Sequence, residues 1–321
     1  MILIMVRRLP PALLAVAALA GGVTACGSDS DEDEPQVVAT TGILADLAER
    51  IAGEDAEVTQ LVPDGASAHD FELSAQDRQT LEEADLIVYN GAGLEAAIPV
   101  EEADSPSWAL AENVGELLPL EEAGAHEPEE AGESEEHAEE AETGEDPHVW
   151  MDPRRTSAAL ESLGAAIADA DPGNADAYEE RAREEAAELQ ELDRELADVL
   201  SAVEPDARAL VTSHDSLGYF ADRYGFEVAA TPFPASGEEA EASPAHLAEV
   251  LDAISEHDVP AVFAAEEDDP EVLRQIAEEA GVAVVDDLLI ESLGDAAGYD
   301  EMLRRDATSI SEALAEGNAT N

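Results

Sequence analysis

A histidine held between two Asp-Pro pairs is the first feature of this sequence that could do chemistry. His148 lies in the octapeptide DPHVWMDP, residues 146–153. Proline fixes its own φ angle and restricts the residue before it, so the backbone around His148 is predicted to form a defined loop. A defined loop suits a metal ligand, although a surface histidine beside an ordinary core tryptophan, Trp150, would give the same local pattern.

Two more histidines and a glutamate lie just beyond predicted strands. His69 follows the β-branched run 57–62, and His214 follows the run 209–212. Glu291 lies beyond another such run, farther along the chain. In open α/β sheets, ligands collect beyond the carboxyl ends of the strands, so these side chains can converge. Imidazole is mostly unprotonated at neutral pH and is the usual nitrogen ligand of zinc, so three histidines and a carboxylate predict a site for a divalent metal.

The other four histidines lie in less favourable places. His246 falls in the first turn of a predicted helix, and His257 falls near its C-terminal end, where positive charge favours the helix dipole. Both are predicted to be structural or exposed. His126 and His137 are surrounded by carboxylates in an acidic tract, which predicts solvated charge with, at most, a weak metal-gathering role.

The elements that must position these side chains alternate between β-branched runs and helical patterns. This alternation is typical of βα units and a mainly parallel sheet. The expected strands are 37–40, 57–62, 86–90, 209–212, 227–230, 261–264 and 282–285. The expected helices are 43–51, a segment after Ser74, 153–170, 217–224, 244–255, 270–280 and 299–314.

One long helical pattern separates the two groups of strands. It starts after Asn174, a predicted N-cap, and runs to Val203 with apolar residues along one side. About thirty residues at 1.5 Å each give roughly 45 Å, which is longer than one lobe is wide. The expected fold is therefore α/β, with two βα lobes of mainly parallel sheets joined by one long rigid helix. A free coiled coil is the alternative, but the apolar seam is short and diluted with alanine.

Composition limits the partners. The 321 residues are 45% hydrophobic, enough for a core in each of two lobes, and the formal net charge is −64. Such a charge repels nucleic acid and anionic lipid surfaces and is typical of a protein kept soluble in salty surroundings. The segment 121–146 is acidic, lacks Lys and Arg, and is predicted to be a disordered loop.

The N-terminal segment is predicted to export and anchor the chain. Arg7 and Arg8 precede an apolar run that is too short for a membrane-spanning helix but suits a secretion signal. The run ends in VTAC, residues 23–26, which resembles the lipobox of bacterial lipoproteins. Cys26 is the only cysteine, so it cannot form an internal disulfide, and lipidation explains its position. We expect an extracytoplasmic protein held at the cell membrane by its lipid anchor alone.

These features divide the chain into segments. The expected segments are a signal peptide at 1–26, a flexible tether at 27–36, an N-terminal lobe at 37–172 that contains the acidic loop 121–146, a linking helix at 173–203 and a C-terminal lobe at 204–321.

Four motifs, in order, resemble the cluster A-I solute-binding proteins of zinc and manganese ABC importers. They are VPDG with HDFE within 62–72, ADLIVYNGAGLE at 84–95, the octapeptide 146–153 and TSHDSLGYF at 212–220. The likeness covers nearly the whole chain from about residue 37 to residue 314.

The resemblance implies a metal held between two lobes, with His69, His148 and His214 as ligands. It favours zinc over manganese, because manganese-binding relatives have a carboxylate at the position of His214. It also implies an ABC importer permease as partner, with a zinc metallochaperone as a further candidate. We expect the chain to be a monomer.

The sequence departs from the family pattern at several positions. Glu291 stands where relatives mostly have aspartate, and Glu266 is the nearest substitute as fourth ligand. Ala68 and Leu73 replace prolines that are common around the first histidine, which loosens that loop. The acidic tract occupies the place of a histidine-rich loop in zinc-binding relatives.

Three classes of function are to be distinguished. The first is a zinc-binding protein that captures extracytoplasmic Zn²⁺ and delivers it to a permease, with a manganese- or iron-binding member of the same family as the alternative. The second is a zinc-dependent hydrolase, but no His-Glu-x-x-His is present and no general base stands out, so no enzymatic activity is expected. The third is an acidic surface protein that buffers cations at many weak sites.

Overall fold

The structure is a computed structural model that describes residues 34–69, 71–120, 144–233, 244–266 and 271–318. The predicted signal peptide, Cys26, His126, His137 and most of the acidic tract lie outside these ranges. Among the helices that are described, none has the length and apolar character needed to cross a membrane.

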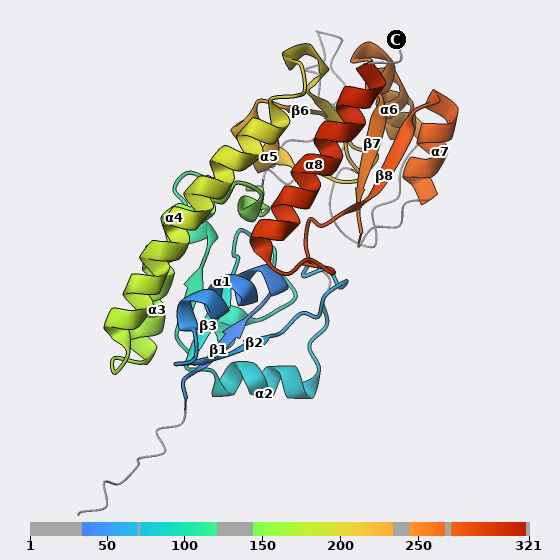
Figure 1. The fold of residues 1–321 in the computed structure, drawn as a ribbon. Helices are drawn as coiled ribbons and strands as arrows, with labels where there is room; N and C mark the ends of the chain where they lie inside the picture. The colour runs from blue at the N-terminus through green and yellow to red at the C-terminus, as the bar shows by residue number, and fades with distance from the viewer. Residues whose placement is uncertain (1–33, 70, 121–143, 234–243, 267–270, 319–321) are drawn as a thin grey trace, which may run out of the picture. The chain divides into compact units, whose positions relative to one another are not determined.

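Four parallel strands form the N-terminal sheet in the order β2-β1-β3-β4 (Figure 1). They are β1 (Gln36–Ala39), β2 (Glu57–Gln60), β3 (Leu86–Tyr89) and β4 (Ser107–Ala109). The first three fall within or beside their predicted runs. The sequence did not predict β4, because Ser-Trp-Ala is short and has no β-branched residue to mark it as a strand.

Three helices of this half begin at identifiable caps. They are α1 (Gly42–Ala52), α2 (Ala75–Glu83) and α3 (Pro153–Ala170). Thr41 accepts a hydrogen bond from the Leu44 amide, and Ser74 forms a capping box with Asp77. Asp152 caps α3 directly after the His148 loop, so the second Asp-Pro pair marks the start of a helix.

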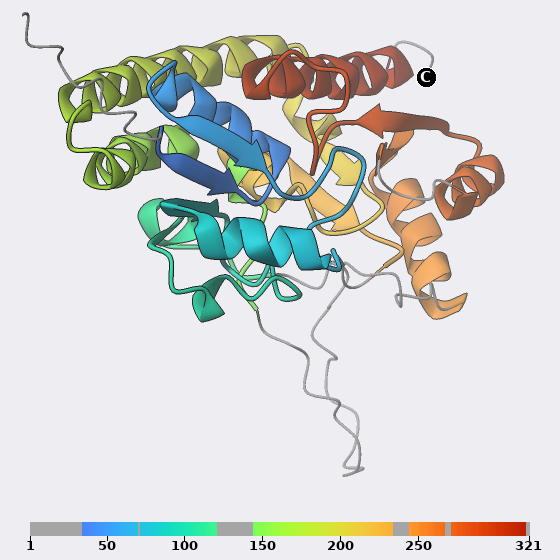
Figure 2. The ribbon, with the colours of Figure 1, turned by 90° about the horizontal axis from the view of Figure 1, so that it is seen from below.

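The long helix α4 (Ala175–Leu200) packs against other helices of the chain, mainly α3, with further contacts to α1 and to α8 (Tyr299–Asn318). Figure 2 shows α4 and α8 side by side. Its apolar side, including Tyr178, Leu189 and Leu196, is fully buried, which disfavours the free coiled coil. Asn174 occupies the predicted N-cap position, but its side chain donates to Asp171 instead of accepting from the helix.

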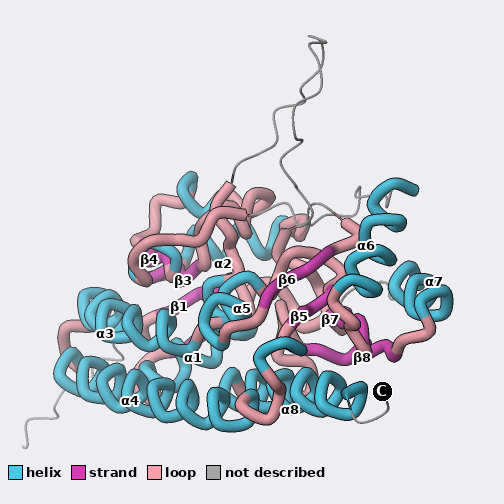
Figure 3. Tube along the Cα trace, turned by 90° about the horizontal axis from the view of Figure 1, so that it is seen from above, coloured by secondary structure: helices cyan, strands magenta, loops and turns pink. Residues whose placement is uncertain are grey.

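The C-terminal half contains two parallel strand pairs, β5 with β6 and β7 with β8, linked by a parallel bridge between Thr212 and Phe263 (Figure 3). The strands are β5 (Ala209–Val211), β6 (Glu227–Ala230), β7 (Ala261–Ala265) and β8 (Ala283–Leu288), and the helices are α5 (Gly218–Tyr224), α6 (Pro244–Glu256), α7 (Glu271–Ala280) and α8. Strand β8 is longer than predicted. Its last residues include aspartates, which disfavour strands, and the prediction therefore ended before them. In the structure Asp286 is paired with Arg274 at 2.5 Å.

Two hydrophobic clusters hold these elements together. The larger one runs from the N-terminal sheet through α1, α3 and α4 to α5 and α8, and the smaller one lies between β5, β7, α6 and α7. The architecture is mixed α/β with parallel sheets, which confirms the predicted fold class.

Candidate metal centre

Four side chains from four separate segments converge on one point. The Nε2 atoms of His69 and His214 lie 3.7 Å and 3.5 Å from Oε1 of Glu291. The ring centroid of His148 lies 5.7 Å from that of His69 and 5.6 Å from that of His214. Candidate ligand atoms of His69, His148 and Glu291 all lie within 4.8 Å of one another. The structure therefore brings together the four residues that the sequence singled out.

The cluster is largely withdrawn from solvent. The side chains of His69, His214 and Glu291 are 13%, 8% and 7% exposed, and that of His148 is 2% exposed. Within the described residues, His148 Nε2 and Glu291 Oε2 are buried without a hydrogen-bond partner. A buried polar atom without a partner costs about 1–3 kcal/mol of stability. Two such atoms in a buried cluster of nitrogen and oxygen donors fit a site whose missing partner is a cation.

His148 is oriented by the aspartate two residues before it. Oδ1 of Asp146 accepts from the His148 amide at 2.9 Å and lies 2.8 Å from Nδ1 of the ring. A carboxylate can only accept, so the proton resides on Nδ1 and Nε2 keeps its lone pair for a metal. Gly218 leaves room for this pair, because an added Cβ there would lie 2.5 Å from Asp146 Oδ2. Sequence reasoning considered Asp146 only as a backbone restraint and missed this role.

The loop that carries His148 is also held through its backbone. The Tyr219 hydroxyl donates to the Asp146 carbonyl at 3.1 Å and accepts from the Leu118 amide at 3.0 Å. Burial raises the pKa of Tyr219 to about 12, so the hydroxyl keeps its proton at neutral pH. On the other side, the side-chain amide of Asn90 donates to the Pro147 carbonyl at 2.8 Å. The backbone on the N-terminal side of His148 is thus fixed by residues from both halves of the sequence, Asn90 and Leu118 on one side and Tyr219 on the other.

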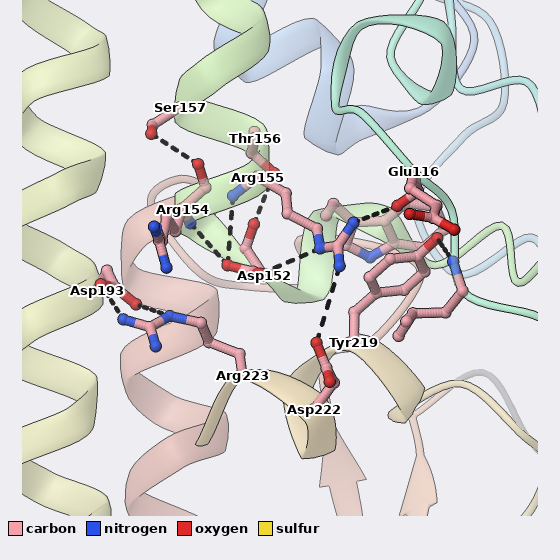
Figure 4. Close-up of polar contacts among 12 residues, drawn as sticks. Glu116, Asp152, Arg154, Arg155, Thr156, Ser157, Asp193, Tyr219, Asp222 and Arg223 are labelled. Atoms are coloured by element: carbon pink, nitrogen blue, oxygen red, sulfur yellow. Dashed lines mark hydrogen bonds and ion pairs between the residues drawn. The ribbon is translucent and has the colours of Figure 1, made fainter. Parts of the chain in front are cut away.

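Figure 4 shows the polar network beside this loop. The Asp152 carboxylate accepts from the Arg154 amide at 2.8 Å and lies 3.4 Å from the Arg155 guanidinium. Arg155 also donates to the Glu116 carbonyl and lies 5.1 Å from the centre of the Tyr219 ring. Arg155 therefore connects the start of α3 to Glu116 and to Tyr219, whose hydroxyl bonds to the Asp146 carbonyl.

A buried glutamate supports the Asn90 side of the loop. Glu95 is 6% exposed and accepts from the amides of Asn90 and Gly91 at 2.7 and 3.0 Å and from the Thr40 hydroxyl at 2.7 Å. Burial raises the pKa of Glu95, and it outweighs these hydrogen bonds, which act to lower the pKa. Sequence reasoning gave Glu95 no role, although a glutamate within a glycine-rich turn after a strand is a signal for such an arrangement.

The loops of the other two histidines are fixed near their strands. The Thr212 hydroxyl donates to the His214 carbonyl at 2.8 Å, and the Ser213 amide donates to the Phe263 carbonyl at 3.0 Å. In the first loop, the His69 amide donates to the Ser67 hydroxyl at 3.2 Å. Each imidazole thus follows a strand end, as the rule for open α/β sheets predicts.

Glu291 is placed by the tryptophan of the octapeptide. The indole nitrogen of Trp150 donates to the Ile290 carbonyl at 2.7 Å. Burial alone would raise the pKa of Glu291, but the close approach of His214 and the positive charge that the three histidines carry when protonated outweigh it and lower the pKa to about 2. The carboxylate is therefore ionised at neutral pH and is ready to bind a cation.

The alternative residues lie elsewhere. Glu266 is exposed at the end of β7 and, within the part of the chain that the structure describes, does not belong to the cluster. His246 and His257 are half-buried, in α6 and just after it, and also lie outside the cluster.

Comparison with known proteins places the chain among bacterial metal-uptake proteins. The family model described as the periplasmic component A of the zinc-uptake complex, ZnuA, matches residues 37–313. The manganese-binding lipoprotein MntA of Halalkalibacterium halodurans is 26% identical over 95% of this chain and 97% of its own length. The high-affinity zinc uptake system protein ZnuA of Bacillus subtilis is 27% identical over 94% of each chain. The structure of the periplasmic zinc-binding protein TroA from Treponema pallidum matches with a TM-score of 0.72 and 27% identity, covering 88% of this chain and 99% of TroA.

Proposed function

The chain belongs to the ZnuA family of metal-binding ABC transporter substrate-binding proteins, and from this premise we propose that it captures extracytoplasmic Zn²⁺ and delivers it to an importer permease. The proposed ligands are His69, His148, His214 and Glu291. The proposal rests chiefly on their convergence in one buried cluster. The proposed arrangement of the chain keeps the predicted division into two lobes joined by the helix α4, with the cluster between the lobes.

The distances within the cluster suit a small tetrahedral ion. Zinc bound at about 2.1 Å by four ligands holds neighbouring ligand atoms about 3.4 Å apart. The separations of 3.5 and 3.7 Å between the imidazole nitrogens and the Glu291 carboxylate are close to this value. These two imidazole–carboxylate separations therefore already have the spacing that zinc requires.

The donor set supports zinc over manganese. Three imidazoles and one carboxylate suit zinc, whereas manganese favours oxygen donors in octahedral geometry. The relatives are named for zinc or for manganese, so membership of the family does not decide between the two metals. The preference for zinc rests on the donor set. Elemental analysis of the purified protein should find one zinc per chain, and manganese should bind weaker by about two orders of magnitude or more. Equal affinity for the two metals would contradict the proposed preference.

The same donor set disfavours a hydrolase. A catalytic zinc is held by three protein ligands and keeps a fourth position for water. In the proposed site the Glu291 carboxylate fills that position. One tight site per chain would also distinguish the protein from an acidic buffer with many weak sites.

Replacing Asp146 by asparagine should weaken zinc binding by about 10-fold or more, because the neutral amide is a weaker acceptor than the carboxylate that orients the ligating histidine. The measurement is a zinc titration against a competing chelator. Asp222→Asn is the matched control, since Asp222 is 57% exposed and its ion pair with Arg155 is long, at 3.7 Å. Equal affinity of Asp146→Asn and the wild-type protein would show that the negative charge of Asp146 does not serve the metal.

Replacing Cys26 by serine should release the protein from the membrane fraction and leave zinc affinity unchanged. Cys26 lies outside the described residues, so the expectation rests on the lipobox-like sequence and on relatives that are named lipoproteins. Fractionation of cells that express each form measures the effect. A serine variant that still sediments with membranes would rule out the lipid anchor.

A further inference from the structure

Glu291 belongs to the segment between β8 and α8, and both ends of this segment are bonded to Trp150. At the first end, the Ile290 carbonyl accepts from the Trp150 indole at 2.7 Å. At the second end, the buried Tyr299 hydroxyl donates to the Trp150 carbonyl and bonds to the Thr156 hydroxyl at 3.2 Å. Because Trp150 is two residues from His148, the segment is held next to the histidine loop.

A second set of contacts joins the start of α8 to α1. The Tyr299 amide donates to Oδ2 of Asp46 at 2.9 Å. Nη2 of Arg50 lies 2.9 Å from the same carboxylate oxygen and donates to Asp300 at 2.7 Å, while Nη1 donates to Glu185 of α4 at 2.9 Å. We call Asp46, Arg50 and Asp300 the clasp.

The clasp leaves no spare room. Gly298 is buried against it, and an added Cβ would lie 2.9 Å from Oδ1 of Asp46 and closer still to Nη2 of Arg50. The Arg50 side chain is 26% exposed and meets three carboxylates in charge-assisted hydrogen bonds, which are stronger than neutral ones. The clasp is therefore a specific junction rather than a loose surface ion pair.

We propose that Arg50 is a positioning residue, which through the clasp holds Glu291 against the three histidines and so sets how long a captured zinc ion stays bound. This inference rests on the proposed function. Ligand distances in a zinc site are defined to about 0.2 Å, so a small shift of the segment is enough to separate the carboxylate from the ion. Release of zinc to a partner then requires the clasp to open.

Two variants test the proposal by different routes. Arg50→Ala removes the guanidinium, and Gly298→Ala adds a methyl group that displaces it while keeping every charge. Stopped-flow measurement of zinc transfer to a chelator should show dissociation about tenfold faster or more in both variants, with association changed far less. Arg194→Ala, which removes an exposed pair with Glu191 of α4, is the control and should leave both rates unchanged.

A double-variant comparison separates positioning from general loosening. If Arg50 acts through Glu291, Arg50→Ala should not speed dissociation any further in a Glu291→Ala background. Effects that multiply in the double variant would overturn the proposal, as would wild-type dissociation rates in Gly298→Ala. Should Arg50→Ala fail to fold, Gly298→Ala and its combination with Glu291→Ala decide the matter. Absence of tight zinc binding by the wild-type chain would instead contradict the proposed function.

Discussion

Alanine in place of His148 should weaken zinc binding by about two to three orders of magnitude. Structural zinc sites bind with about 10–16 kcal/mol, so each of four ligands carries on the order of 2.5–4 kcal/mol. His148 also lies between the other two histidines, with its ring 5.6–5.7 Å from each. His69→Ala and His214→Ala should have similar effects. Glu291→Ala should lose less affinity, because water replaces an oxygen ligand more easily than an imidazole.

Titration with zinc under a competing chelator measures all four variants. His246→Ala and His257→Ala serve as controls and should bind zinc like the wild-type protein, since both histidines lie outside the cluster. An unchanged affinity in His148→Ala or His214→Ala would contradict the proposed site. A loss in Glu291→Ala as large as that of the histidine variants would show that the carboxylate closes the coordination shell.

Leucine in place of Gly164 should destabilise the fold by about 3 kcal/mol, at the upper end of what overpacking a core costs. Gly164 lies where α3 crosses α4, and an added Cβ would lie 2.5 Å from the Ala182 Cβ and 3.2 Å from the Tyr178 carbonyl. A carbonyl of a helix backbone cannot turn aside, so the two helices must separate. Thermal unfolding followed by circular dichroism measures the loss.

Ala158→Leu is the matched control for Gly164→Leu. Ala158 is exposed on the same helix, and leucine is about as good a helix former as alanine. Leucine is a better helix former than glycine, so helix propensity alone would make Gly164→Leu more stable. An unfolding temperature equal to that of the control would show that α3 and α4 can move apart at no cost.

The alternation of β-branched runs with helical patterns predicted the parallel strands, because buried strands are rich in β-branched residues. Val37, Val38 and Ile87 are buried and β-branched, so the run marks the strand. The ends of the strands could not be predicted as closely. Thr40, for example, lies just beyond the end of β1, although its backbone amide still bonds to the Val88 carbonyl. Strand β4 left no such signal, because its place depends on pairing with β3 and not on its own composition.

Three of the candidate ligands could be selected from the sequence, because imidazole and carboxylate groups after strands point to metal chemistry, and His148 could be selected because it lies between two Asp-Pro pairs. The choice between Glu291 and Glu266 could not be made in the same way, since both follow strands. In the structure the contact between Trp150 and Ile290, 140 residues apart, places Glu291 at the histidines. The clasp could not be predicted from the sequence either, because Asp46 and Arg50 are about 250 residues from the start of α8 and contact it only in the folded chain. Metal binding by the four residues stays a prediction.

The position of Trp150 makes the site optically accessible. Its ring lies 5.4 Å from the His148 ring in an edge-on arrangement, and the chain has only two tryptophans. The other, Trp108, donates to the Ser162 hydroxyl in the N-terminal half. Intrinsic fluorescence of a Trp108→Phe protein therefore reports from a single indole beside the proposed site. Capture and release could then be followed in real time without a dye, a label or a chelator.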